Sequence, residues 1–66
     1  FALPPLQREA VVLFEYEGIS LNEIASMVGS DVGAVKARLH RGRERLRKAL
    51  QPYLNSHREI VTLEKA

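Results

Sequence analysis

The sequence contains no cysteine, which excludes disulfide bonds and any metal site built from thiolates. Its two histidines, His40 and His57, are too few and too far apart to form a metal site on their own. No apolar run approaches the roughly 20 residues that a membrane-spanning helix needs, and Phe1 is not followed by a signal-peptide pattern. We therefore expect a cytoplasmic protein with no membrane contact, no metal, no cofactor and no small-molecule ligand.

The chain is short and shows no alternating apolar pattern that would indicate a β-strand. Its 66 residues are enough for one small domain, near the lower limit for a fold held by a hydrophobic core alone. Because it begins at Phe1 and continues directly into Leu-Pro-Pro, we interpret it as the C-terminal domain of a longer protein. No internal repeat or low-complexity segment is present.

The basic residues are concentrated in one segment. Seven of the thirteen residues from Lys36 to Lys48 are Lys or Arg, with Glu44 as the only acid among them. The first 35 residues hold a single base, Arg8, against five acids, and the last 16 are balanced. This asymmetry indicates a polyanion as one partner and leaves the acidic part free to contact a protein.

Local signals predict three helices. The first follows Pro4 and Pro5, which suit a first helical turn, and continues with apolar residues at helical spacing to about Tyr16, before Gly18. The second covers residues 21–28, where Ser20 and Glu23 have the spacing of a capping box and Gly29 provides the stop.

A third helix is predicted over residues 32–50, with Asp31 as its N-cap. At about 100° per residue, one narrow arc of this helix holds the expected core residues. They are Val35, Leu39, Gly42, Leu46 and Ala49. The opposite side carries Gly33, Lys36, Ala37, His40, Arg41, Glu44 and Lys48. We expect Pro52 to end the helix, so that residues 52–66 form a tail that is either a short helix or a disordered end.

Only three residues join the second and third predicted helices, which is the connection length of a helix-turn-helix. In this motif the second helix enters the DNA major groove with its N-terminal part against the base edges. The residues expected there are Gly33, Lys36, Ala37, His40 and Arg41. The remaining cations of the helix are expected to meet phosphates or solvent.

Other interpretations of the same residues carry less weight. The basic run could be a solvated face with local pairs such as Glu44 with Lys48, but seven bases exceed what solubility requires. An enzyme is not expected, because no pair of titratable residues has a catalytic arrangement. Phe14, Tyr16 and Tyr53 are expected to pack in the core or at its margin, since they form no stripe for stacking bases.

Several short motifs occur in one order and at one spacing. They are Leu3-Pro4, Arg8-Glu9-Ala10, Glu17-Gly18, Glu23-Ile24-Ala25, Val28-Gly29 and the run from Val32 to Arg43. Together they closely resemble region 4 of the sigma-70 family, in the form found in extracytoplasmic-function (ECF) sigma factors. The sequence departs from that pattern at Asp31, where Ser is usual, at Ala34, where Thr is usual, and at Gly42, where Ala is usual. Gly42 lowers helix propensity by about 1 kcal/mol relative to Ala.

The resemblance implies an all-α, three- to four-helix bundle with a helix-turn-helix, of the winged-helix-like class but without a clear wing. It implies residues 1–51 as the region 4 domain of a bacterial cytoplasmic sigma factor, with residues 52–66 as the tail. The implied partners are double-stranded promoter DNA, at its −35 element, the β flap of RNA polymerase core, and an anti-sigma factor. The residues that match the family's recognition helix are Val32, Gly33, Lys36, Ala37, Arg38, His40 and Arg41. The expected phosphate contacts are Arg43, Arg45, Arg47 and Lys48.

Two alternative functions keep the helix-turn-helix. One is a sigma-like decoy domain that binds an anti-sigma factor or polymerase without DNA, although such a protein has no use for the basic field. The other is the output domain of a LuxR-type response regulator, whose recognition helix usually has a different composition. The basic run from Arg41 to Arg47 fits sigma better.

Overall fold

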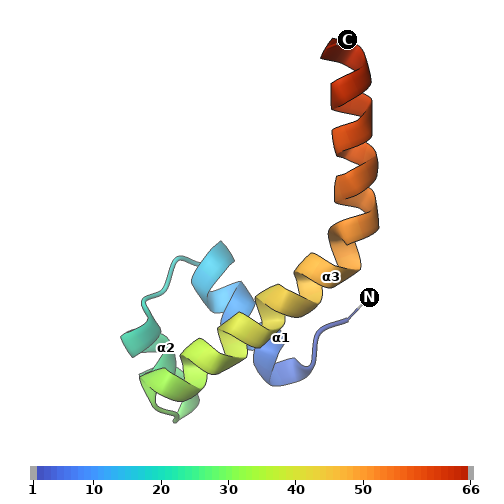
Figure 1. Cartoon of the computed structure of the whole chain (residues 1–66). Helices are drawn as coiled ribbons and strands as arrows, with labels where there is room; N and C mark the ends of the chain where they lie inside the picture. Colours follow the sequence, from blue (N-terminus) through green and yellow to red (C-terminus); the bar gives the residue numbers. More distant parts are fainter. Residues whose placement is uncertain (1, 66) are drawn as a thin grey trace.

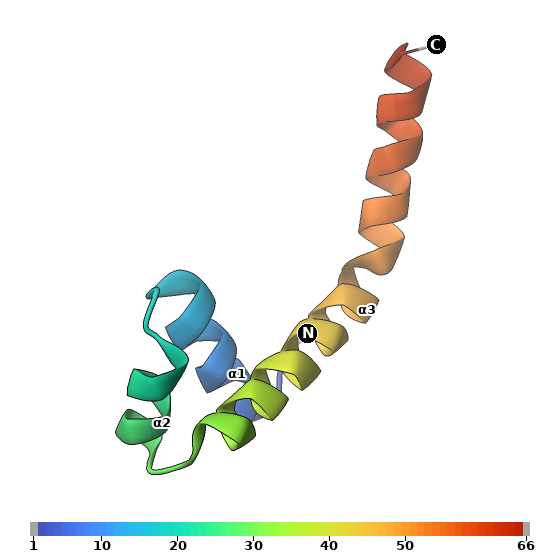
Figure 2. The same ribbon diagram turned by 60° about the vertical axis from the view of Figure 1, so that its left-hand side comes forward.

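The computed structural model describes residues 2–65, with side chains described for residues 2–53. The elements in chain order are α1 (Pro5–Val11), η1 (Val12–Tyr16), α2 (Leu21–Val28) and α3 (Val32–Lys65). No strand occurs among residues 2–65. The first three elements pack on the N-terminal half of α3, as Figures 1 and 2 show. The predicted all-α fold with a helix-turn-helix is confirmed.

The first predicted helix is present, but its last turn is wider than an α-helix. Residues Val12–Tyr16 form a π-helical turn, in which the Glu17 N–H donates to the carbonyl oxygen of Val12 at 3.1 Å. Gly18 then has a φ of +68°, a backbone conformation that glycine adopts without steric cost. Phe14 of this turn packs against both core clusters of the molecule.

The predicted caps of α2 are both present. The Glu23 N–H donates to Ser20 Oγ at 3.2 Å, which satisfies one of the free donors of the first turn. Gly29 ends the helix in the left-handed conformation, with a φ of +68°. The chain therefore turns within three residues from α2 into α3, as a helix-turn-helix requires.

Two small clusters form the core, both against the predicted apolar arc of α3. One joins α2 to α3 through Ile24, Ala25 and Val35, and Val35 is fully buried. The other joins α1 to α3 through Ala10, Val11 and Leu39. The burial of Val35, Leu39 and Gly42 confirms the predicted core face of α3.

The prediction that Pro52 ends the third helix is wrong. The helix α3 continues to Lys65 with Pro52 inside it, and it bends close to this residue in Figures 1 and 2. A proline in a helix removes one backbone hydrogen bond and its ring displaces the preceding turn, which produces a kink when the helix continues on both sides.

Two of the three aromatic residues that were expected to pack are exposed instead. Phe14 is half-buried, but Tyr16 is 82% exposed and Tyr53 is 74% exposed. Tyr16 ends the π turn, whose wider spacing takes it out of the apolar stripe of α1. Tyr53 follows the kink and lies beyond the part of α3 that carries the two core clusters.

Candidate nucleic-acid interface

The N-terminus of α3 is fixed by its predicted cap. The Ala34 N–H donates to Asp31 Oδ1 at 2.7 Å, and the Val35 N–H donates to the Asp31 carbonyl oxygen at 3.1 Å. The carboxylate also complements the positive end of the helix dipole. Asp31 therefore caps the N-terminus of α3. It fills the capping role that Ser, the usual residue at this position, can also fill.

The predicted groove residues occupy the solvent side of the first three turns of α3. Gly33, Lys36, His40 and Arg41 are exposed, whereas Ala37 and Arg38 are half-buried. Val32 differs from the rest, because it packs against the cluster of Ile24, Ala25 and Val35. The structure thus brings six of the seven residues to accessible positions and uses the side chain of Val32 to hold α3 on α2.

Two of the four expected phosphate contacts are already paired with acids. Arg43 Nε donates to Glu15 Oε1 at 2.6 Å, a second Arg43 nitrogen reaches the same oxygen, and the guanidinium lies 5.4 Å from the centre of the Phe14 ring. Arg47 donates to Glu44 Oε2 at 3.0 Å. Glu44 therefore pairs with Arg47, one turn away at i+3, and not with Lys48, the example pair of the less favoured solvated-face interpretation.

The pair of Arg47 with Glu44 also changes the acidity of both groups. The hydrogen bond and the charge of Arg47 lower the pKa of Glu44 below its ordinary value. The same contact with Glu44 raises the pKa of Arg47. Both side chains are about half exposed, so the contact is screened by water and contributes little to stability.

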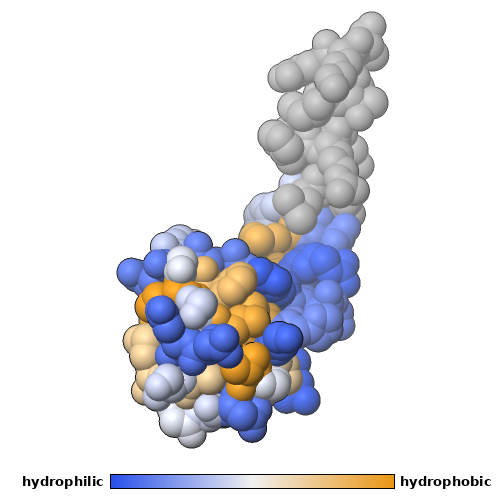
Figure 3. Space-filling model, turned by 90° about the vertical axis from the view of Figure 1, so that its left-hand side faces the viewer, coloured by the Kyte–Doolittle hydropathy of each residue, from blue (hydrophilic) through white to orange (hydrophobic). Residues whose placement is uncertain are grey.

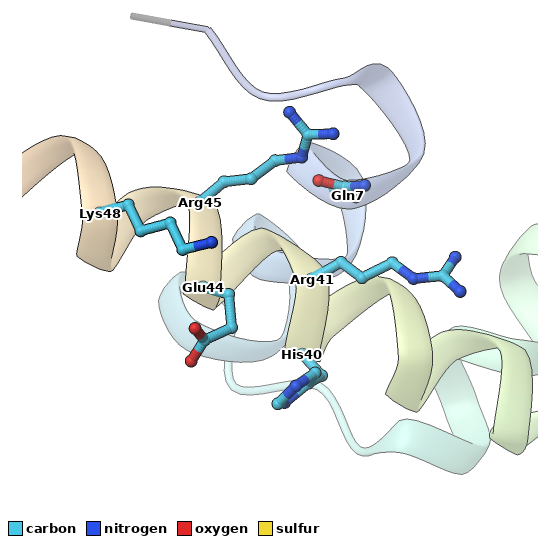
Figure 4. A pocket seen from close by; sticks show the side chains of 6 residues that line it. All are labelled: Gln7, His40, Arg41, Glu44, Arg45 and Lys48. Atoms are coloured by element: carbon cyan, nitrogen blue, oxygen red, sulfur yellow. The ribbon is translucent and has the colours of Figure 1, made fainter.

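On the other side of α3, three cations line an open hollow of about 500 Å³ (Figure 4). Its lining residues are Gln7, His40, Arg41, Glu44, Arg45 and Lys48. Arg41, Arg45 and Lys48 form no ion pair with any other residue in the range 2–53. The hollow is therefore one place where the basic helix leaves its charge available to an external anion.

Gln7 was not predicted from the sequence as part of the site. It lies on α1 and reaches α3 because the two helices cross closely at Gly42. A Cβ atom at Gly42 would lie 2.8 Å from Val11 Cγ2 and 3.3 Å from the Gln7 carbonyl oxygen. The available signal was Gly42 itself, since a glycine in the core arc of a helix marks a close crossing.

The exposed apolar residues are found mainly away from the basic part of α3. Among residues 2–53 the large ones are Leu6, Val12, Tyr16, Met27, Leu50 and Tyr53. Figure 3, which looks at the side where α2 lies in Figure 1, shows hydrophobic surface bordered by hydrophilic surface on the compact part of the molecule. This mixed surface contrasts with the basic segment of α3 from Lys36 to Lys48.

Among the described residues, no group of three or more His, Asp or Glu side chains is placed to bind a metal ion. None of their helices has the length and apolar character needed to cross a membrane.

Comparisons with known proteins agree with the geometry. The family model described as "Sigma-70, region 4" matches residues 2–46. The ECF RNA polymerase sigma factor SigE of Mycolicibacterium smegmatis is 49% identical over 49 residues, which cover 74% of this chain and 19% of that protein. The RNA polymerase sigma-H factor of Pseudomonas aeruginosa is 46% identical over 52 residues, or 79% of this chain and 27% of that protein.

A third relative, the ECF RNA polymerase sigma factor SigW of Bacillus subtilis, is 47% identical over 49 residues, or 74% of this chain and 26% of that protein. The matches thus span between 19% and 27% of the length of these three relatives. No solved structure gave a significant match. On the family match, the relatives and the helix-turn-helix geometry, the chain belongs to region 4 of the sigma-70 family, in its ECF form.

Proposed function

We propose that this chain binds the −35 element of a promoter, with the N-terminal part of α3 in the major groove and α2 across the DNA backbone. The observation that carries the proposal is the unpaired positive charge on the solvent side of α3, directly after the turn of a helix-turn-helix. Lys36, Arg41 and Arg45 make no ion pair within residues 2–53. A polyanion compensates such a field most directly.

The residues divide by the part of the DNA that they can reach. Lys36 and Arg41 are exposed and carry donors that suit guanine O6 and N7, and His40 can meet either a base or a phosphate. Gly33 and Ala37 are small and let the helix backbone approach the base edges. Arg38 is half-buried at the edge of this face, so we assign it to a phosphate.

Protein partners are a second part of the proposal. Relatives of this chain are named RNA polymerase sigma factors, and we propose that the acidic and apolar surface of α1, η1 and α2 contacts the β flap of the polymerase core, with an anti-sigma factor as a competitor. Residues 1–51 form the proposed DNA-binding domain, and residues 52–66 are the proposed tail.

The alternatives make different predictions. A sigma-like decoy binds polymerase or an anti-sigma factor and leaves DNA unbound, which gives no role to the unpaired cations of α3. The match to region 4 over residues 2–46 favours a sigma factor domain over the output domain of a LuxR-type response regulator.

A salt-titrated selection from a randomised double-stranded DNA pool tests the proposal. We expect the retained DNA to share a short motif, and we expect affinity to fall steeply with salt because several phosphates are neutralised. A folded sample that shows no motif and no DNA binding at low salt would identify a decoy. Binding without a motif would restrict α3 to phosphate contacts in the absence of polymerase.

A further inference from the structure

We propose that Gln7 of α1 and Arg45 of α3 together bind one phosphate of the DNA backbone, beside the bases that the N-terminal part of α3 contacts. The proposal rests on the proposed function, because it requires DNA along the solvent side of α3. It assigns a DNA contact to α1, which lies outside the helix-turn-helix, and it places one particular cation of the basic run at one particular phosphate.

The first support is the arrangement of the hollow. Gln7 and Arg45 line the same cavity of about 500 Å³, and Figure 4 shows the Arg45 side chain extending toward the turn of α1 that carries Gln7. Glu44 also lines the hollow, but its carboxylate points away from Gln7 in this view and accepts a hydrogen bond from Arg47 at 3.0 Å. The end of the hollow near Gln7 therefore has cations and an amide but no free carboxylate.

The second support is an unsatisfied hydrogen-bond acceptor. Gln7 Oε1 is buried and has no hydrogen-bond partner among the described residues. Buried polar atoms nearly always have a partner, so a donor that reaches this oxygen is favoured. The Arg45 side chain is exposed and makes no hydrogen bond within residues 2–53, which leaves the five N–H donors of its guanidinium free.

The two side chains complement each other around an anion. One N–H of the Arg45 guanidinium can donate to Gln7 Oε1, while two others bind the phosphate oxygens as a fork. The amide nitrogen of Gln7 then has two N–H donors for the same phosphate. The phosphate thus orders both side chains and satisfies the buried oxygen at the same time.

The position along α3 indicates a phosphate, not a base. Arg45 follows Val32 by thirteen residues, or about 20 Å along the helix axis, beyond the N-terminal part that reaches base edges. Gln7 projects from a separate helix beside α3. Contacts from neighbouring elements to the DNA backbone fix the orientation of a recognition helix in its groove.

Gly42 sets the distance between the two partners. Its missing side chain lets the Gln7 backbone approach α3, since a Cβ at this position would lie 3.3 Å from the Gln7 carbonyl oxygen. Glycine in place of the usual Ala at position 42 therefore has a structural effect. It lets α1 come close enough to α3 for Gln7 to line the hollow.

A double-mutant cycle with the complete 66-residue chain tests the proposal. Gln7→Leu removes the amide but keeps a side chain of similar size, and Arg45→Gln removes the charge. We expect Gln7→Leu to weaken DNA binding roughly tenfold, because it removes hydrogen bonds to a charged group. In the Arg45→Gln background the same change should cost less than about twofold, since the shared phosphate is no longer held. The salt slope should fall by about 0.9 for Arg45→Gln and stay unchanged for Gln7→Leu.

Arg47→Gln provides the matched control, because it removes the same charge two residues further along the same helix. Arg47 does not line the hollow. We expect the effects of Gln7→Leu and Arg47→Gln to add. Additive effects of Gln7→Leu and Arg45→Gln would overturn the proposal.

A scan with DNA that carries one neutral methylphosphonate at a time gives a second measurement that does not depend on the folding of Gln7→Leu. One position should weaken binding by the wild-type chain and have no effect on Arg45→Gln, an exposed substitution. If no position behaves in this way, Arg45 binds no single phosphate and the proposal is wrong. If the folded wild-type chain binds no DNA at low salt, the proposed function itself fails, a result distinct from binding with additive effects.

Discussion

The two flanks of α3 carry the same kind of residue in opposite electrostatic states. The paired flank consists of Arg43 and Arg47, whose guanidinium groups are bound by Glu15 and Glu44. The open flank consists of Arg41, Arg45 and Lys48, which form no ion pair within residues 2–53, although Glu44 also lines their hollow. Positions 43 and 45 differ by about 200° around a helix, so they lie on opposite sides.

The difference between the flanks arises from how α1 and η1 cross α3. The crossing places Gln7 at the open flank and Glu15 at the paired flank, with Gly42 between them. Gln7 is neutral and therefore leaves the cations of the open flank unpaired. Glu15 is acidic and neutralises Arg43 on the paired flank. The number of basic residues in this helix therefore overstates the positive charge that is available to an external anion.

The largest effect is expected from breaking the crossing itself with Gly42→Val. The new side chain would collide with Val11, since even its Cβ would lie 2.8 Å from Val11 Cγ2. Overpacking of this kind costs about 1–3 kcal/mol, and we expect the upper part of this range for a β-branched residue. Urea unfolding followed by circular dichroism measures the free energy of unfolding.

Ala37→Val is the matched control for that measurement, because it introduces the same residue on the solvent side of the same helix. It should cost only about 0.5 kcal/mol, the difference in helix propensity. Equal losses for Gly42→Val and Ala37→Val would mean that α1 and α3 do not meet closely at Gly42. Both flanks would then lose the structural basis of their difference.

A comparison of Arg41→Ala with Arg47→Ala tests the flanks directly through DNA binding. Arg41→Ala should weaken binding by about 1–3 kcal/mol and relax the base preference, as expected for a contact to a base edge. Arg47→Ala should leave the salt slope unchanged, because Glu44 already neutralises this residue. Fluorescence anisotropy at several salt concentrations, with cognate and scrambled duplexes, measures both quantities.

Either result could contradict these assignments. Equal losses on cognate and scrambled DNA would make Arg41 a phosphate contact. A slope that falls by about 0.9 in Arg47→Ala would show that DNA displaces Glu44 and that the paired flank also binds phosphate.

In the Glu15→Gln variant the paired flank should gain an unpaired cation, as the open flank already has. This change releases Arg43 from its partner on η1, so we expect tighter DNA binding and a salt slope steeper by up to about 0.9. Stability should fall by less than about 1 kcal/mol, because the pair is half exposed. Glu9→Gln changes the net charge equally without releasing a cation, so a steeper slope in that control would point to net charge alone.

Much of the fold could be predicted because its signals are local. Ser20 with Glu23 defines the start of α2, and Gly29 and Asp31 define the turn between α2 and α3, in each case through contacts within four residues. The core arc of α3 follows from helical periodicity, and the burial of Val35 and Leu39 agrees with it. Motifs that depend on such short sequence separations can be recognised in a single sequence, and so can the family that they indicate.

The remainder depends on contacts that no local pattern contains. Arg43 and Glu15 are 28 residues apart in sequence, and their contact follows from the angle at which η1 crosses α3. Gln7 joins the hollow for the same reason. The continuation of α3 through Pro52 was also missed, because a proline is the sequence signal both for the end of a helix and for a kink within one.

The smallest expected effect concerns protonation at the paired flank. Arg47 lowers the pKa of Glu44, so the ionised carboxylate is favoured in the folded state. The pair therefore contributes stability above the ordinary pKa of a glutamate, and this contribution is lost as the pH falls through the lowered pKa. An NMR titration should find a higher Glu44 pKa in Arg47→Gln than in the wild type, whereas Arg45→Gln, on the open flank, should leave it nearly unchanged. Equal shifts in the two variants would show that the general field of α3, and not the contact at 3.0 Å, sets the acidity of Glu44.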